Sequence, residues 1–209
     1  MRIDRRSPIY QKLVPPDDPA LGAIYHNLGG LEHARGRFAL GEPFARRALE
    51  ITERAFGPDD PDTAADRAAL AAILSGEGKY KQAEAMYIDT LAVFEKTPDS
   101  SSYDIAVNLN NLAAAYFAES RLEEAEAPYL RALAIKEKLL GPTHPDVAVT
   151  LNDLAVLYKT ERRYDEAAPL YRRALEILTN TLGPRHPNVI TCRDNYAALL
   201  KLQNAPTPH

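Results

Sequence analysis

The sequence predicts an all-α fold: a solenoid of antiparallel helix pairs, with four repeats and a C-terminal capping helix. The first observation is a constant step, because Leu28, Leu70, Leu112 and Leu154 follow one another at intervals of 42 residues. A fixed period of about 20–50 residues is typical of repeat architectures. The second observation is that apolar residues within each period recur with the spacing of one helix face. The third is the recurring Gly-Pro pair between helices, which is a frequent helix stop.

The composition excludes several classes of protein. The 209 residues are 45% hydrophobic and 26% charged, which indicates a globular chain, and the net charge of −4 predicts no nucleic-acid partner. No apolar run approaches the roughly 20 residues of a membrane span, so we expect no membrane partner. Cys192 is the only cysteine, which excludes an internal disulfide and fits a reducing compartment. The N-terminus lacks the apolar core of a secretory signal, so we expect a cytoplasmic protein.

The helix stops divide the chain into an array and two flanking segments. We expect an N-terminal arm or partial helix at residues 1–16, the array at 17–203 and a disordered tail at 204–209. Within the array, the four repeats and the capping helix are placed at about 20–58, 62–97, 104–140, 146–182 and 187–203. The capping helix would cover the apolar face of the last repeat. Between the second and third repeats, Thr-Pro-Asp-Ser replaces the Gly-Pro loop, which predicts a flexible or unusually shaped connection.

Small residues recur at matched positions of the third and fourth repeats, and we expect them to let paired helices approach closely. They are Ala113, Ala125, Ala132, Ala155, Ala167 and Ala174. The turn within each pair is only a few residues long, which predicts antiparallel neighbours.

The repeated motif resembles a known family. Leu-Ala, Tyr, Ala, Tyr and Ala follow at fixed spacing, first from Leu112 to Ala132 and again from Leu154 to Ala174. This pattern is similar to the tetratricopeptide repeat (TPR). The 42-residue unit, the Leu-Gly-Pro-x-His-Pro linker and the Leu-Asn-Asn-Leu-Ala first helix resemble the TPR domain of kinesin light chains and its bacterial relatives. The resemblance covers residues 17–202.

The resemblance implies a right-handed superhelix in which the first helix of each repeat lines a concave groove. It also implies binding of a peptide or protein segment in that groove. We therefore expect a non-catalytic scaffold, and we expect the protein to be a monomer or weak homodimer. Two alternatives remain open. The chain could be a regulatory or sensor array of a larger multidomain protein, or a structural solenoid that associates with itself.

Helical geometry places certain positions of each first helix opposite its core face, and these are the candidate groove residues. They are His26, Gly30, His33, Val107, Asn110, Ala114, Phe117, Val149, Asn152, Val156, Lys159 and Lys201.

Asn110 and Asn152 are the strongest candidates, because an asparagine amide offers both donors and an acceptor to the main chain of an extended peptide. The alternative is that they bond within their own repeat or only to water. Asn111, equivalent to Asp153 and Asn195, is expected to bond between repeats instead. An exposed Phe117 would indicate an interaction surface; the alternative is that it packs against the fourth repeat.

The candidate groove departs from the family's pattern in charge. Kinesin light chains and carboxylate-clamp TPR proteins carry Lys or Arg beside the asparagine, but Val107 and Val149 stand three residues before Asn110 and Asn152. The departure favours a partly apolar peptide over an acidic one.

No motif predicts catalysis, a metal or a cofactor. The Gly-Glu-Gly-Lys stretch at 76–79 lacks the spacing and the Ser or Thr of a phosphate-binding loop. His26 and His33 stand two helical turns apart, about 10 Å, which is too far to ligate one metal. Cys192 has no recognisable base. His144 and His186 are equivalent loop residues, for which we expect a structural role such as bonding loop carbonyls.

Overall fold

The computed structural model describes residues 15, 17–97 and 101–203. The predicted N-terminal arm, except for Pro15, and the predicted tail therefore lie outside the described residues. The chain divides into two compact units, residues 1–100 and 101–209. The division falls in the stretch where the sequence replaces the Gly-Pro loop, and each unit is described by itself.

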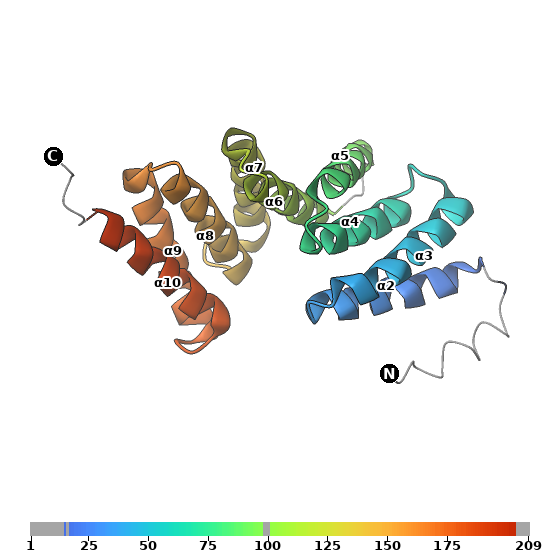
Figure 1. Ribbon diagram of the computed structural model, residues 1–209, viewed down its shortest axis with the longest axis horizontal. Coiled ribbons are helices and arrows are strands. Elements are labelled where there is room, and N and C mark those ends of the chain that lie inside the picture. The colour runs from blue at the N-terminus through green and yellow to red at the C-terminus, as the bar shows by residue number, and fades with distance from the viewer. Residues whose placement is uncertain (1–14, 16, 98–100, 204–209) are drawn as a thin grey trace. The chain divides into compact units, whose positions relative to one another are not determined.

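The first unit contains two helix pairs. Helices α2 (Pro19–Ala34) and α3 (Phe38–Phe56) form one pair, and α4 (Pro61–Gly76) and α5 (Tyr80–Lys96) form the other (Figure 1). Besides the contacts within each pair, α4 packs against both α2 and α3. Because α4 is the first helix of its pair, this packing joins the two repeats.

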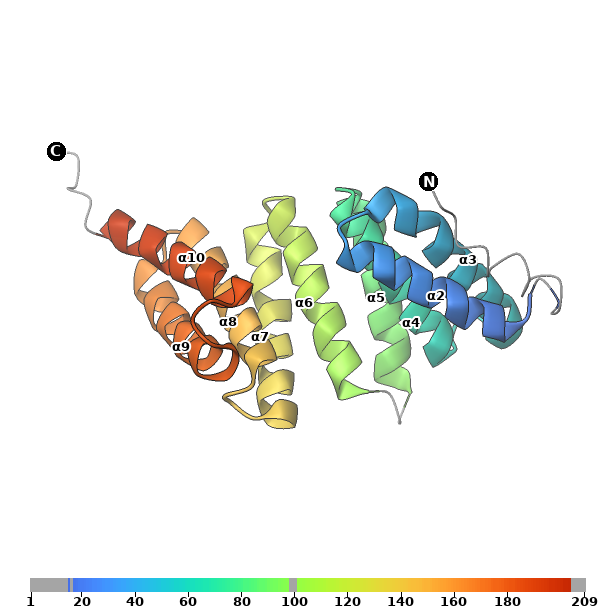
Figure 2. The same cartoon turned by 90° about the horizontal axis from the view of Figure 1, so that it is seen from below.

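The second unit repeats this arrangement and adds a final helix. Its pairs are α6 (Ser102–Ala118) with α7 (Leu122–Leu140), and α8 (Pro145–Thr160) with α9 (Tyr164–Leu182), followed by α10 (Pro187–Gln203). Figure 2 shows α6, α8 and α10 in succession, and α8 contacts both of the others. Helices are the only regular structure in the described parts of both units, so the prediction of an all-α solenoid of antiparallel helix pairs is confirmed.

Side chains in the loops cap the first helices. The backbone N–H of Asp62 donates to Asp60 Oδ1 at 2.9 Å at the start of α4. His144 and His186 occupy the equivalent position before α8 and α10, and each Nδ1 accepts a backbone N–H, from Asp146 at 3.1 Å and from Asn188 at 3.2 Å. Their role is structural, but they accept from helix N–H groups rather than donating to loop carbonyls.

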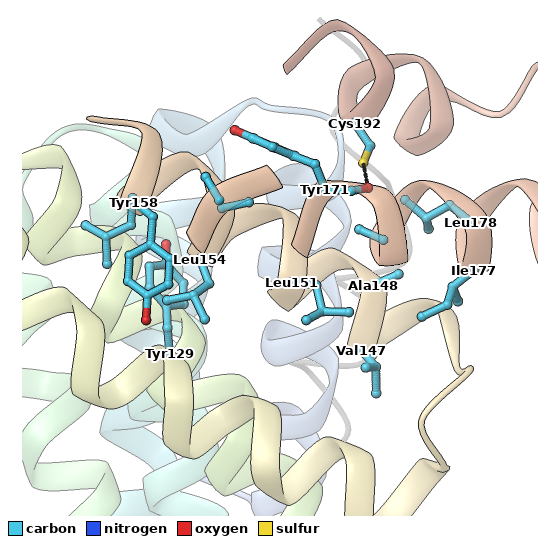
Figure 3. Packing of buried hydrophobic residues seen from close by; sticks show 14 of the residues in the cluster. Tyr129, Val147, Ala148, Leu151, Leu154, Tyr158, Tyr171, Ile177, Leu178 and Cys192 are labelled. Carbon is cyan, nitrogen blue, oxygen red and sulfur yellow. Dashed lines mark hydrogen bonds between the residues drawn. The ribbon is translucent and has the colours of Figure 1, made fainter. Parts of the chain in front are cut away.

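The core of the second unit lies between α8, α9 and α10 and extends to α6 and α7 (Figure 3). Leu151, Leu154 and Tyr171 are almost fully buried there. The matched small residues have no exposed surface, as expected for close helix packing: Ala113, Ala125, Ala132, Ala155, Ala167 and Ala174. None of the helices described here is both long and apolar enough to cross a membrane.

Cys192 joins α10 to this core. Its side chain is 1% exposed, and its Sγ donates to the backbone oxygen of Tyr171 at 3.8 Å (Figure 3). Burial raises the pKa of the Cys192 thiol to about 11. The thiol is therefore protonated and inaccessible at neutral pH, which suits a packing role and not that of a nucleophile.

Candidate functional site

In the first unit, the predicted groove residues lie along α2. His26 is half-buried, whereas Gly30 and His33 are exposed. A Cβ placed on Gly30 would meet no atom within 4 Å, so the surface is open at this point. The rings of His33 and Phe38 form a T-shaped contact, with the ring centroids 5.5 Å apart.

In the second unit, four predicted residues lie on α6. Ala114 is exposed, and Val107 and Asn110 are half-buried. Phe117 is half-buried against the hydrophobic cluster of this unit. Phe117 thus keeps part of its surface, and its contact with the cluster is in line with the alternative in which it packs within the array.

The remaining predicted residues lie on α8 and α10. Val149, Asn152 and Lys159 are half-buried, and Lys201 is exposed in the last turn of α10. Val156 packs against the hydrophobic cluster, like Phe117. These positions thus differ widely in how much surface they offer to a ligand.

The two asparagines take part in a polar network that joins successive first helices. Asn110 Nδ2 donates to Asp153 Oδ2 at 3.3 Å, and Asn152 Nδ2 donates to Asp153 Oδ1 at 3.4 Å. Asn152 Oδ1 in turn accepts from Asn195 Nδ2 on α10 at 3.2 Å. Bonding between repeats, which the sequence suggested for the position of Asn111, thus involves Asn110 and Asn152 as partners.

A lysine from the second helix reaches the same network. Thr150 Oγ1 donates to Asn110 Oδ1 at 2.9 Å and accepts from Lys136 Nζ at 2.9 Å. Lys136 is only 5% exposed, and burial lowers the pKa of its ammonium group, while the charges of Asp146 and Asp153 oppose that shift. Loss of hydration likewise raises the pKa of Asp153. Hydrogen bonds from both asparagines and the charge of Lys136 oppose this shift, because they lower the pKa. Both groups are therefore held in an environment that disfavours their charged forms.

The first unit has an equivalent network with different chemistry. His26 Nδ1 donates to Asp66 Oδ1 at 2.6 Å, and Thr52 Oγ1 donates to Asp66 Oδ2 at 2.9 Å. Asp66 is only 5% exposed. The hydrogen bond to Asp66 raises the pKa of His26, although burial opposes the shift.

The two networks occupy the same place in the repeat. A shift of 84 residues carries His26 onto Asn110 and Thr52 onto Lys136, and it carries Asp66 onto Thr150. The residues predicted from the sequence do not include Asp66, Thr52, Lys136 and Thr150. The available signal was a polar residue at a helix position that is apolar elsewhere, since Lys136 corresponds to the buried Leu178.

We call a junction the place where both helices of one repeat meet the first helix of the next. A cavity opens beside each of two such junctions. In the first unit a cavity of about 420 Å³ lies between α2, α3 and α4, and its lining includes Ala23, His26, Asn27, Thr52, Asp62 and Ala65. In the second unit a cavity of about 170 Å³ lies between α8, α9 and α10, lined by Val149, Asn152, Asp153, Leu178, Asn188 and Thr191. A shift of 126 residues carries the first of these sets onto the second, in the same order.

The chemistry of the two cavities differs because the side chains at matched positions differ. Val149 stands where the first unit has Ala23, and Leu178 stands where it has Thr52, so larger side chains make the second cavity smaller. Asn188 stands where the first unit has Asp62, so the second cavity has an amide in place of a carboxylate. In the described part of the chain, no group of three His, Cys, Asp or Glu side chains is placed to hold a metal ion.

Solved structures share this fold. The nearly identical TPR-like repeats of the kinesin light chain type from Podosopora anserina give a TM-score of 0.72 at 21% identity, covering 88% of this chain and 88% of that chain. BtubC (BKLC) from P. vanneervenii gives 0.68 at 24% identity, covering 92% of this chain and 86% of that one. A Rap protein complexed with competence and sporulation factor gives 0.70 at 18% identity, covering 93% of this chain and 57% of that one.

The sequence itself matches the tetratricopeptide repeat family over residues 21–96, 104–180 and 161–207. A search of curated protein sequences gives no match. The family match spans most of the chain, includes both units and agrees with the helix pairs described above. The chain belongs to the tetratricopeptide repeat family.

Proposed function

We propose that this protein is a non-catalytic interaction module that binds a peptide or protein segment along the surface made by its first helices. The observation that carries the proposal is the pair of cavities at matched positions of the two units. Each cavity opens beside the first helices of its own unit, where it offers a place for a side chain of a bound segment.

The solved Rap protein supports the general activity. Its structure contains competence and sporulation factor, and its fold matches this chain with a TM-score of 0.70. In at least one protein of similar structure, helical repeats of this architecture therefore hold a bound factor. At 18% identity, the ligand itself does not carry over to this protein.

Asn110 and Asn152 keep their place in the proposal, together with Val107, Ala114, Val149, Lys159 and Lys201 around them. An asparagine side chain has two N–H donors and an oxygen with two lone pairs. The bonds to Asp153, Thr150 and Asn195 use part of this capacity. The rest is available to the main chain of a ligand.

Filling the cavities tests the proposal. Peptides would be selected from a random twelve-residue display library against the wild-type protein, and their affinities measured by fluorescence polarisation. We expect Ala65→Trp or Thr191→Trp to weaken binding roughly tenfold or more, because overlap in a filled site costs about 1–3 kcal/mol. The matched controls are Ala85→Trp and Thr181→Trp, which lie exposed on the second helices α5 and α9.

The controls should bind as the wild type does, and circular dichroism would check that every variant remains folded. Selected peptides that bind both cavity-filling variants with unchanged affinity would contradict binding along the first helices. Failure to select any peptide would contradict the proposed function as a whole.

Self-association is a second candidate, and α10 provides the observation that favours it. Ile190 and Leu200 are 44% and 40% exposed, whereas the equivalent residues of α8, Ala148 and Tyr158, are buried in the hydrophobic cluster. A second copy could cover this apolar surface. We expect the mass measured by light scattering to rise with concentration and Leu200→Lys to abolish the rise; a constant mass would leave the protein a monomer.

A further inference from the structure

The cavity of the first unit has the chemistry of a site for a basic side chain. Asp66 lies among its lining residues with 5% exposure, and Asp62 lies exposed at its edge, in the first turn of α4. His26 is the only basic side chain in the described lining, so the cavity has a net negative charge even when His26 is protonated. Ala23, Ala65 and Phe56 provide apolar walls.

The junction of α6, α7 and α8, which is equivalent by a shift of 84 residues, shows which side chain such a site accepts. There, Lys136 of the chain itself extends from α7 and donates through Nζ to Thr150 Oγ1 at 2.9 Å. Thr150 is equivalent to Asp66, and Asp146, whose charge acts on Lys136, is equivalent to Asp62. The protein therefore places an internal ammonium group at this junction of the second unit.

Two substitutions leave the same place open in the first unit. Thr52 replaces Lys136, so no side chain of α3 carries a positive charge to this junction in the described lining. Pro19 replaces Tyr103, whose hydroxyl donates to Asp146 Oδ2 at 2.7 Å, and proline cannot make such a bond to Asp62. The result is a cavity of about 420 Å³ with Asp62 at the position of Asp146 and a second carboxylate, Asp66, where the second unit has Thr150.

We infer that the cavity between α2, α3 and α4 takes the side chain of a lysine or arginine residue of the bound peptide, with Asp62 and Asp66 as its ionic partners. The apolar walls receive the methylene groups of such a side chain, and the two carboxylates receive its charged end. The inference rests on the proposed function, since it assigns one residue of the peptide that the module binds. It agrees with the absence of Lys and Arg from the described lining and with a preference against acidic ligands.

The test uses the same random twelve-residue library with the full chain. We expect the peptides selected by the wild type to share a Lys or Arg at one position. Replacing that residue with Met in a labelled peptide should weaken binding roughly tenfold or more, because bonds to charged groups contribute about 1.5–3 kcal/mol.

Two variants of the protein separate the cavity from other acidic groups. Asp62→Asn keeps the shape and removes one charge, and Thr52→Lys places the lysine of the second unit in the first, so both should erase the difference between the Lys and Met peptides. Asp59→Asn, in the loop before α4 and outside this cavity, is the matched control and should preserve the difference.

The outcomes distinguish the two proposals. Selected peptides without a shared basic residue, or a Lys-to-Met loss that persists in Asp62→Asn and Thr52→Lys, would overturn the inference and leave the proposed function standing. A library that yields no binding peptide would overturn the proposed function, and the inference with it.

Discussion

Replacing Lys136 with leucine and Asp153 with asparagine should stabilise the second unit by about 1–4 kcal/mol at neutral pH. Both groups have lost much of their hydration. This loss lowers the pKa of Lys136 and raises the pKa of Asp153, so the neutral form of each is favoured despite their mutual attraction. The repeats themselves suggest the replacements, since Leu178 is equivalent to Lys136, and Asn111 and Asn195 are equivalent to Asp153. Asparagine can still bond to Asn110 and Asn152 in place of the carboxylate.

The pH dependence of this gain follows from the directions of the two pKa shifts. The pKa of Lys136 is lowered in the folded state, so its penalty is relieved as the pH rises toward the ordinary lysine value of 10.5. The pKa of Asp153 is raised, so its penalty is relieved as the pH falls toward the ordinary aspartate value of 3.8. The advantage of the double variant should therefore be largest near neutral pH and shrink toward both extremes.

Cys192 provides the measurement. It is the only cysteine, and it lies 1% exposed in the core of the second unit, so a thiol reagent reaches it only when this unit opens. The labelled fraction, followed by mass spectrometry against urea concentration, then gives the unfolding free energy of that unit. Lys138→Leu with Asp165→Asn is the control, because both residues are exposed and a change within about 0.5 kcal/mol is expected. A double variant less stable than the wild type would mean that the two charges are a net benefit.

Asn110→Ala should destabilise the second unit by about 2–3 kcal/mol in the same assay. The change removes the donor to Asp153 and the acceptor of the Thr150 hydroxyl, and it leaves a poorly hydrated carboxylate with fewer partners. Asn180→Ala, at an exposed position of α9, should change the stability little.

The loss should depend on the charge of Asp153. In an Asp153→Asn background there is no carboxylate that could lose a partner. The destabilisation caused by Asn110→Ala should therefore fall by about 1 kcal/mol or more. Equal costs in the two backgrounds would show that the Asn110–Asp153 bond contributes nothing specific. Because Asn110 supports the fold, its alanine variant is a poor probe of peptide binding, and filling the cavity at Thr191 is the cleaner experiment.

The helices could be predicted closely from local signals. The α10 helix begins at Pro187 and ends at Gln203, as the sequence places it, because Pro favours the first turn and the apolar spacing extends over the helix. The buried alanines follow from the same periodicity. The family resemblance is likewise confirmed, since the tetratricopeptide repeat family matches residues 21–96, 104–180 and 161–207.

The candidate site was predicted less well. The sequence predicted Asn110 and Asn152 as groove residues and expected bonding between repeats at the position of Asp153 and Asn195, but it did not indicate that the two asparagines are the partners in those bonds. Helical geometry predicts a groove position for Phe117, yet this side chain is half-buried against the hydrophobic cluster of the second unit. Which face a residue occupies depends on its own helix, whereas its exposure depends on the neighbour.

The sequence by itself determined that this protein is an all-α array with a 42-residue period, because helix periodicity and helix stops act over a few residues of chain. The tertiary structure alone decided which junction is filled and which is open. Lys136 occupies one junction, and Thr52 leaves its counterpart as a cavity of about 420 Å³ with Asp66 inside. The partners at these junctions are up to 43 residues apart and must lie within about 3 Å of each other, so the packing of successive helices determines the outcome.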